Sequence, residues 1–373
     1  MAMTSLAVRT ATPADVASFG IGEPRDLGAA PGDDWSGFLA SLEVHRLTGL
    51  ALAAVDAGAL RLTTEQVEDL TKRHGEAMAA ALTIERELLL VGAVLREAGV
   101  DAIVLKGPAV AHSAYPDASL RPFGDLDLLV RTADWRKACQ ALEGSGRRRR
   151  LPEPRPGFDE RFGKAAVHRG PSGIEVDLHR TLVVGPFGLW IRPDEVFEHT
   201  SPLSLGGRTF ERLDDTCMML HACVHAALGW RAPFLWTVRD VGQIALMAGI
   251  DWDALARLAE RWRLQVVVQH ALTMATDLLG VPMPAGAETV MTLSSRRSER
   301  RALDAYVTEQ RTRGGTAVST LRAIPGVAPK AAYVRALLFP RRDFLMHRDD
   351  SRKPSYVRRW MTAIRWMAAR RES

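Results

Sequence analysis

The chain has 373 residues, of which 47% are hydrophobic and 25% charged, so a mainly disordered, collagen-like or fibrous protein is excluded. Its net charge of +5 comes from the end of the chain: residues 341–373 contain ten Lys and Arg against four Asp and Glu, and the first 340 residues sum to −1. An argument for binding to nucleic acid or to a membrane surface therefore applies to that segment alone.

The first 100 residues predict a leader followed by helices. Residues 1–32 are rich in Ala, Gly, Pro and Asp and show little periodicity, so we expect a flexible leader. From residue 33 the apolar residues recur at helical spacing in two runs, each preceded by Asp or Thr residues that can cap a helix. The second run ends at Gly99, which gives an N-terminal helical region over residues 33–100.

The pattern then changes and predicts a small α/β unit over residues 101–200. Residues 102–105 form a short apolar run, typical of a buried strand, that ends at Lys106-Gly107-Pro108. Pro108 suits the first turn of a helix. Further strands are expected at residues 125–130, 164–168 and 173–182, and a helix at 132–142. Arg147 to Arg150 lie in a Pro-rich segment that predicts a solvated loop, with contact to an anionic substrate as the alternative.

The remaining sequence predicts a helical domain over residues 201–340 and a basic helical tail over residues 341–373. Helices are expected near residues 214–228, 238–247 and 252–279. In the tail, Tyr356, Trp360, Ile364 and Met367 share one helical stripe. We expect this stripe to dock on the protein, and the alternatives are an anionic membrane or RNA.

Three cysteines without a Cys-x-x-Cys pair do not describe a disulfide framework. No run of 18 apolar residues indicates a membrane span, and the start of the chain lacks the pattern of a secretory signal. We therefore expect a cytoplasmic protein.

The strongest chemical pattern is the segment Arg121-Pro-Phe-Gly124-Asp125-Leu-Asp127-Leu-Leu-Val. Residues two apart on a strand point to one face, so Asp125 and Asp127 present two carboxylates side by side. Like charges this close repel one another, and a divalent cation with oxygen ligands is the simplest way to stabilise them.

A second strand repeats the pattern some 50 residues later. In Ile174-Glu175-Val176-Asp177-Leu178-His179 the three polar residues share one face and the apolar residues share the other. If this strand pairs beside the first, Glu175 or Asp177 completes a cluster of three carboxylates able to hold two Mg²⁺ ions for phosphoryl or nucleotidyl displacement.

Lys106-Gly107 adds a possible anion site. A strand that ends in a Gly turn at the start of a helix presents free backbone N–H groups, and Lys106 adds a point charge. In the helical half, His221 and His225 lie four residues apart and are expected in the core, with half of a metal site as the alternative. Asp240 has two equal interpretations, a functional residue or a buried polar residue bonded to one of these histidines.

These blocks resemble the bacterial nucleotidyltransferase family described as uncharacterised, a branch of the DNA-polymerase-β-like superfamily. The resemblance rests on Val-Leu-Lys106-Gly107-Pro-Ala-Val, on Gly124-Asp125-Leu-Asp127 and on Val-Asp177-Leu-His179, with looser matches over residues 80–360. It implies an α/β (α+β) fold, in which a small mixed-sheet nucleotidyltransferase core lies between N- and C-terminal helical regions.

The resemblance also implies roles for single residues. Asp125, Asp127 and Asp177 would be metal ligands, with Glu175 as the rival for the third position, where the family more often has Glu. Lys106, Gly107, Arg121 and Gly124 would contact the triphosphate. The candidates for supporting residues are Glu175, His179, His225 and Asp240.

The function expected from these features is transfer of a nucleoside monophosphate from a nucleoside triphosphate, with Mg²⁺ or Mn²⁺ as the metal. Encoding of relatives beside biosynthetic genes favours a small-molecule or peptide acceptor. The alternatives are phosphoryl transfer at the same site, a non-catalytic nucleotide-binding module, and a nucleic-acid-binding protein that acts through the basic tail.

Overall fold

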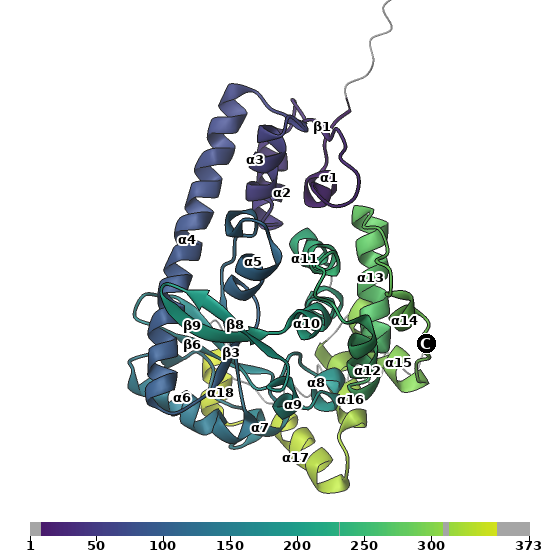
Figure 1. The fold of residues 1–373 in the computed structure, drawn as a ribbon. Coiled ribbons are helices and arrows are strands. Elements are labelled where there is room, and N and C mark those ends of the chain that lie inside the picture. Colours follow the sequence, from purple (N-terminus) through teal and green to yellow (C-terminus); the bar gives the residue numbers. More distant parts are fainter. Residues whose placement is uncertain (1–8, 231, 309–312, 349–373) are drawn as a thin grey trace, which may run out of the picture.

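Short runs of alternating apolar residues build the central sheet of the protein. The computed structural model describes residues 9–230, 232–308 and 313–348. In these residues seven strands form one mixed sheet in the order β5-β6-β7-β4-β3-β9-β8 (Figure 1). The strands are β3 (Ala102–Val104), β4 (Leu126–Val130), β5 (Arg148–Arg149), β6 (Ala165–Arg169), β7 (Glu175–His179), β8 (Thr200–Leu205) and β9 (Arg208–Leu213).

The middle of the sheet mixes parallel and antiparallel pairs. β4 pairs in parallel with β7 and antiparallel with β3, and β3 pairs in parallel with β9. The outer pairs β5–β6, β6–β7 and β8–β9 are antiparallel. The fold is therefore mixed α+β, as expected.

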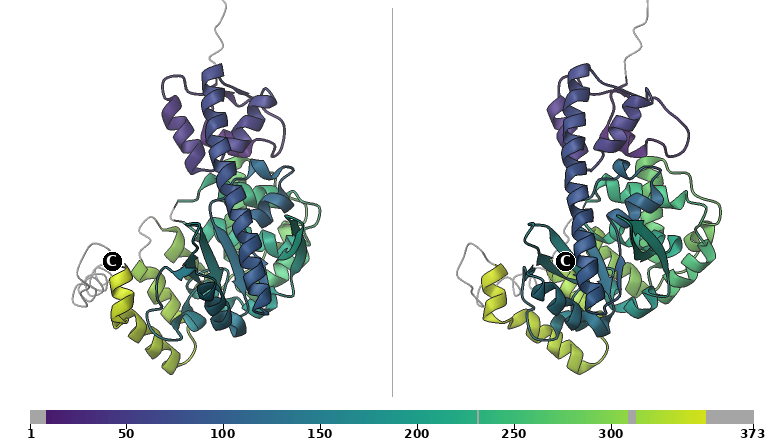
Figure 2. Two further views of the ribbon diagram at one scale, coloured as in Figure 1. Left: turned by 90° about the vertical axis from the view of Figure 1, so that its left-hand side faces the viewer. Right: turned by 60° about the vertical axis from the view of Figure 1, so that its left-hand side comes forward.

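One face of the sheet packs against the helices α4 (Thr64–Glu97) and α6 (Trp135–Gly144). Thr63 caps α4, and Ile84, Leu88 and Val91 from this helix share a core with Leu128 of β4. Figure 2 shows α4 running from the N-terminal helices down to the sheet. The long helix therefore joins the two parts of the molecule.

The other face of the sheet meets a bundle of helices. Ile103 of β3 and Leu129 of β4 belong to the same large core as Met219 of α10 and Val241 of α11. The bundle contains α10 (Asp215–Leu228), α11 (Leu235–Ala245), α12 (Trp252–Arg261) and α13 (Gln265–Leu279). Polar residues on this face of the sheet are thus enclosed between the strands and the bundle.

The described part of the expected leader is folded, so its prediction as a flexible segment is wrong for residues 9–32. Thr12 and Asp15 form a capping box at α1 (Pro13–Ser18), and Val16 and Ala17 are buried against α11 and α13. β1 (Gly28–Ala29) pairs in parallel with β2 (Leu60–Arg61). The helices α2 (Trp35–Val44) and α3 (Thr48–Asp56) follow, as the expected helical region requires.

Two further predictions need correction. The expected boundary at residue 200 is followed by β8 and β9, which complete the sheet, and their turn is Gly206-Gly207 with both φ angles positive, a typical two-residue hairpin. The arginine run is not a solvated loop throughout. Arg147 is buried against Glu87, and Arg149 pairs with Asp159.

The other described helices are shorter or peripheral. They are α5 (Pro108–Ala114), η1 (Ala118–Leu120), η2 (Thr132–Asp134), α7 (Phe158–Phe162), α8 (Pro186–Trp190), α9 (Pro193–Val196), α14 (Glu288–Met291), α15 (Arg297–Val307), α16 (Arg313–Ala323), α17 (Val327–Leu338) and α18 (Arg342–Arg348). The apolar stripe expected in the tail, Tyr356 to Met367, lies outside the described residues.

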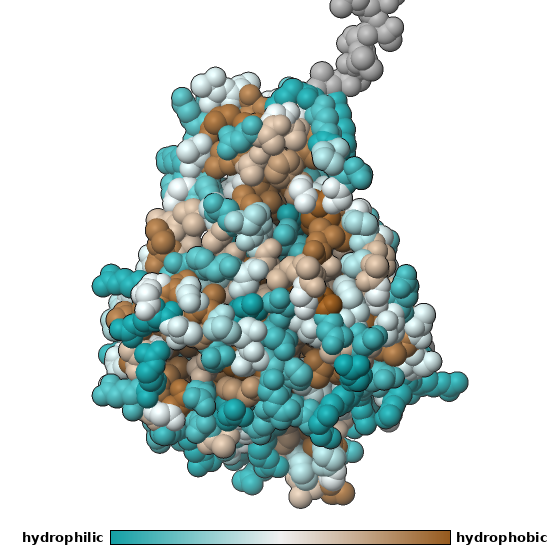
Figure 3. All heavy atoms as spheres, viewed as in Figure 1, coloured by the Kyte–Doolittle hydropathy of each residue, from teal (hydrophilic) through white to brown (hydrophobic). Residues whose placement is uncertain are grey.

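Among the described residues, no single helix combines the length and apolar composition that a membrane span needs. The pair α2 and α3 passes that test only together, with a bend of 118° between the two helices. On the face shown in Figure 3, hydrophobic residues are scattered among hydrophilic ones.

Candidate functional site

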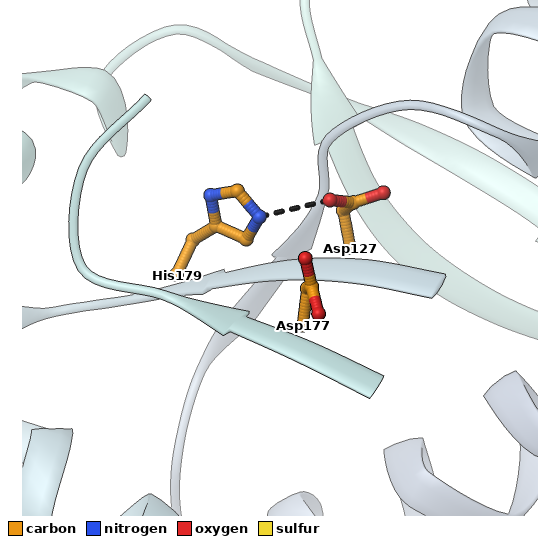
Figure 4. A group of neighbouring side chains, drawn as sticks. All are labelled: Asp127, Asp177 and His179. Atoms are coloured by element: carbon orange, nitrogen blue, oxygen red, sulfur yellow. Dashed lines mark hydrogen bonds and ion pairs between the residues drawn. The ribbon is translucent and has the colours of Figure 1, made fainter. Parts of the chain in front are cut away.

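Two aspartates and a histidine share one face of the parallel strands β4 and β7. Asp127 is the register partner of Asp177, and His179 lies two residues further along β7. Successive strand residues point to opposite faces, so Leu128 and Val176 enter the core beneath α4 while the polar side chains point to the other face. One candidate ligand atom from each of the three polar residues lies within 4.8 Å of the others (Figure 4).

Lys106 lies between two of the carboxylates. It follows β3, the antiparallel neighbour of β4, and its Nζ is 3.0 Å from Asp125 Oδ2 and 3.0 Å from Asp127 Oδ2. Burial alone would lower the pKa of Lys106, but the two carboxylates outweigh it and raise this pKa. Burial would likewise raise the pKa of Asp127, but Lys106 and His179 hold it well below its usual range. Lys106 and Asp127 therefore form an ionised pair.

His179 fixes the orientation of Asp127. Its Nε2 lies 2.8 Å from Asp127 Oδ1, and its Nδ1 lies 3.2 Å from the carbonyl oxygen of Thr181. Both His179 and Asp127 are fully buried. A histidine that is held on both sides restricts the carboxylate it contacts, as supporting residues do in metal sites.

Asp177 is neutralised less completely than Asp127. Burial raises the pKa of Asp177, and repulsion from Asp127 adds to the shift although His179 opposes it. Lys164 lies directly before β6, and burial lowers its pKa, with repulsion from Lys106 in the same direction. Two lysines, the buried Asp127 and the half-buried Asp177 thus share one region on this face of the sheet.

Glu175, the rival for the third acidic position, lies on the same strand as Asp177 but has different neighbours. Its register partner is Arg169, and its carboxylate pairs with the exposed Arg150 at 3.1 Å. The register of β4 and β7 brings Asp177, rather than Glu175, beside Asp127.

The donor atoms suit a hard divalent cation. Asp127 Oδ2 is buried and accepts no hydrogen bond, and its contact is the 3.0 Å ion pair with Lys106 Nζ. Asp125 and Asp177 add further carboxylate oxygens within reach of the same lysine or of Asp127. Oxygen ligands of this kind are those that Mg²⁺ and Mn²⁺ take in proteins.

Arg121 and Asp240 form a buried ion pair. Arg121 donates to Asp240 through Nε at 3.2 Å and Nη2 at 2.7 Å, and Tyr115 Oη donates to the same carboxylate at 2.8 Å. Arg121 is only 3% exposed, so its donors meet a protein acceptor instead of the open triphosphate position expected from the sequence. Asp240 is buried as expected, but its partners are Arg121 and Tyr115 and not a histidine.

Comparison with known protein families identifies the family to which this site belongs. The model of the uncharacterised nucleotidyltransferase family matches residues 31–280, which is more than half of the chain. The chain belongs to this family. The match covers both strands that carry the aspartates, Lys106, and the Arg121–Asp240 pair.

Other comparisons are more distant. The chain is similar to a solved structure, an antigenic nucleotidyltransferase-like protein from Paracoccidioides brasiliensis, at 14% sequence identity and a TM-score of 0.32. That similarity covers 57% of this chain and 94% of the other. At this TM-score, it carries no argument about the site. None of the curated proteins matches the chain.

In this member of the nucleotidyltransferase family, the two histidines of α10 have core surroundings. His221 Nδ1 lies 3.3 Å from the carbonyl oxygen of Leu105, and the ring of His225 packs on Trp236 at 5.1 Å between centroids. Burial lowers the pKa of His221 to about 3 and that of His225 well below its usual range, so both rings are neutral. Among the described residues, neither belongs to the group of ligand atoms around Asp127.

The two glycines expected near the triphosphate occupy tight positions. Gly107 has φ +61° directly after Lys106, a conformation that other residues rarely adopt, and a Cβ there would lie 3.3 Å from the carbonyl oxygen of Asp125. A Cβ at Gly124 would lie 3.2 Å from Arg46 Nη2.

Arg46, Lys164 and Trp236 are site residues that the sequence patterns did not single out. The guanidinium of Arg46 lies 4.6 Å from the centre of the Trp236 ring and 3.6 Å from Asp125. Trp236 lies in residues 80–360, over which the chain loosely resembles the family, whereas Arg46 lies outside them.

Proposed function

We propose that this protein is a nucleotidyltransferase that uses Mg²⁺ or Mn²⁺ to transfer a nucleoside monophosphate to a hydroxyl or phosphate group of a small-molecule or peptide acceptor. The observation that carries the proposal is the register of β4 and β7, which sets Asp127 beside Asp177 with Lys106 across Asp125 and Asp127. We also propose that the family is a bacterial branch of the DNA-polymerase-β-like superfamily.

Asp125, Asp127 and Asp177 would hold the metal. When bound, a divalent cation supplies stabilisation of the charge that develops on the transferring phosphate. His179 keeps Asp127 in one orientation through its 2.8 Å contact. These residues provide the positioning on which nucleotidyl transfer depends.

Lys106 is the residue of this chain best placed to bind the phosphates. It already neutralises two carboxylates, so a cation held by Asp125 and Asp127 would release its ammonium group for a phosphate oxygen. The acceptor oxygen then attacks the α-phosphorus, the bond from that phosphorus to the bridging oxygen breaks, and pyrophosphate leaves.

Asp177 suits the removal of the acceptor proton. Its carboxylate lies beside Asp127 on the same face of the sheet, and a carboxylate within hydrogen-bond reach of an attacking hydroxyl group can act as its general base. The proton lost from the acceptor hydroxyl would pass to the Asp177 carboxylate.

The test uses nucleoside triphosphates labelled at the α-phosphate, with Mg²⁺ and a fractionated cell extract as the source of acceptors. The wild type is expected to label a species whose mass rises by one nucleoside monophosphate, and Asp177→Asn is expected to lose this label. Glu175→Gln is the matched control because Glu175 lies on the same strand and face but pairs with Arg150. Absence of label with every triphosphate, metal and fraction would contradict the proposal.

The same experiment addresses the alternatives. Label that transfers from the γ-phosphate indicates a phosphotransferase, and binding of nucleotide without transfer indicates a non-catalytic module. Binding to RNA or DNA with a steep dependence on salt would indicate a nucleic-acid-binding protein.

A cytoplasmic location is part of the proposal. Cys139, Cys217 and Cys223 are all free and buried, which fits a reducing compartment.

A further inference from the structure

Two arginines end helices in the same unusual way. Among the described residues, Arg46 and Arg263 alone have positive φ angles without being glycine, at 52° and 56°. Each follows the C-cap of a helix, α2 or α12, and each is the residue before the next buried leucine, Leu47 or Leu264. Glycine is the usual residue at this position of a helix end, so the shared backbone conformation does not explain why arginine is present.

The side chains of both arginines also lie over tryptophan rings. Arg46 lies 4.6 Å from the centre of Trp236, and Arg263 lies 5.4 Å from the centre of Trp190. Backbone conformation and aromatic contact are therefore common to the two arginines. Arg46 also has a charged neighbour at the acidic site, the carboxylate of Asp125 at 3.6 Å.

Arg46 faces the acidic site with unused donors. Its Nη1 lies 3.6 Å from Asp125 Oδ1, which is an ion pair but too long for a hydrogen bond, and this nitrogen is buried without a hydrogen-bond partner. Its Nη2 lies beside Gly124. A guanidinium group has five N–H donors, and buried donors are normally paired.

Arg121, the other arginine on Trp236, is not available to a ligand. It also lies 4.6 Å from the ring centre, but Asp240 accepts from its Nε and Nη2. The Trp236 ring thus supports one arginine that is fixed to a protein carboxylate and one that has an unpaired buried donor.

We propose that Arg46 binds a phosphate group of the nucleotide beside Asp125, on the opposite carboxylate oxygen from Lys106; this inference rests on the proposed function. Lys106 contacts Asp125 Oδ2 and Arg46 faces Oδ1, so the two cations approach the same carboxylate from its two oxygens. A phosphate offers acceptors for the unpaired donors of Arg46, in the charge-assisted geometry that guanidinium groups favour. The N-terminal helical region thereby supplies a residue of the nucleotide site.

The test compares Arg46→Gly with Arg263→Gly. Glycine fits both backbone positions, so both variants are expected to keep the wild-type fold, measured by circular dichroism and Tm. Binding is measured by calorimetry with Mn²⁺ and each of ATP, GTP, CTP and UTP, and with Mn²⁺ and inorganic tripolyphosphate. Arg46→Gly is expected to weaken binding of the preferred triphosphate and of tripolyphosphate at least tenfold, whereas Arg263→Gly stays within twofold of wild type.

Arg46→Gln and Arg46→Lys complete the series. Gln keeps the length of the side chain without the charge and is expected to bind as weakly as the glycine variant, while Lys restores the charge without the paired donors and is expected to fall between. If Arg46→Gly does not fold, Arg46→Gln decides. Triphosphate binding within twofold of wild type in the Arg46 variants, or an equal loss in Arg263→Gly, overturns the inference alone. No binding of any triphosphate by the wild type overturns the proposed function as well.

Discussion

Two groups of charged residues, each with a buried aspartate, differ in how fully their partners satisfy them. In the Asp240 group, formed by Tyr115, Arg121 and Asp240, the carboxylate accepts three hydrogen bonds. In the acidic group, formed by Lys106, Asp125, Asp127 and Asp177, a buried oxygen of Asp127 accepts no hydrogen bond, and burial raises the pKa of Asp177.

The difference in hydrogen bonding distinguishes a group that stabilises the fold from a group that is suited to bind a ligand. A buried ion pair whose carboxylate accepts three hydrogen bonds holds elements together, here η1 and its flanking turn against α11. A buried Asp127 oxygen that has an ion pair but no hydrogen bond is costly for the fold, and the carboxylates around it offer ligands for a cation. The two groups therefore predict different consequences for similar substitutions.

The largest effect is expected from Asp127→Asn. This variant removes a central carboxylate charge while keeping the shape of the side chain, so we expect Mn²⁺ binding in the presence of nucleotide and any nucleotidyl transfer to fall at least about 10³-fold. Electron paramagnetic resonance measures free Mn²⁺, and Tm reports the fold. Mn²⁺ binding within threefold of wild type would show that the acidic group, like the Asp240 group, does not bind a cation.

Next in size is Asp240→Ala. It leaves the buried Arg121 without its carboxylate, so we expect the free energy of unfolding to fall by about 3–5 kcal/mol, measured by urea denaturation. Tyr115→Phe removes one hydrogen bond and is the control, with an expected loss of about 1 kcal/mol. A loss below about 1 kcal/mol for Asp240→Ala would show that the Asp240 group is not a structural element.

A buried histidine outside both groups provides a reference for the cost of buried charge. His168 is fully buried, and burial lowers its pKa to about 4. The unfolded chain binds this proton near pH 6.5, so the contribution to stability is complete above pH 6.5 and is lost as the pH falls towards 4, by up to about 3 kcal/mol. Urea unfolding of wild type and His168→Phe at pH 7.5, 5.5 and 4.5 is expected to show a smaller pH dependence for the variant; equal slopes contradict this.

The smallest effect is expected from Gly107→Ala. Alanine at φ +61° and ψ −114° costs about 1–3 kcal/mol of stability, and its Cβ would lie 3.3 Å from the carbonyl oxygen of Asp125. Gly99→Ala, at φ +59°, is the control because its nearest contact is the end of a flexible lysine. Both variants are expected to lose stability in urea, Gly107→Ala at least as much as Gly99→Ala, but only Gly107→Ala is expected to weaken Mn²⁺ and nucleotide binding.

The sequence predicts which face of a strand a residue occupies more easily than it predicts which residues of other strands lie beside it. The period of two in β4 and β7 places Asp127, Asp177 and His179 opposite their apolar neighbours, and the structure has this arrangement. The choice of Asp177 over Glu175 depends on strand register, which the residues alone do not determine.

Contacts between distant segments account for what the sequence did not predict. The partner of Arg121 is 119 residues away, so nothing near Arg121 indicated that its charge would be taken up by Asp240. Arg46 enters the site from a helix end, and its neighbours in sequence show no chemical pattern. The extension of the sheet beyond residue 200, by contrast, has a local signal in the sequence. Gly206-Gly207 between two alternating segments is typical of a β-hairpin turn.

The parallel pairing of β4 and β7 also determines when this site can exist. Parallel strands need a long crossover, and here it runs through α6, β5, α7 and β6 before Asp177 arrives beside Asp127. A chain growing from the ribosome therefore exposes Lys106, Asp125 and Asp127 first, and Asp177 follows some 50 residues later. In that order of synthesis, the group of three carboxylates is complete only after the crossover has closed and β7 has paired with β4.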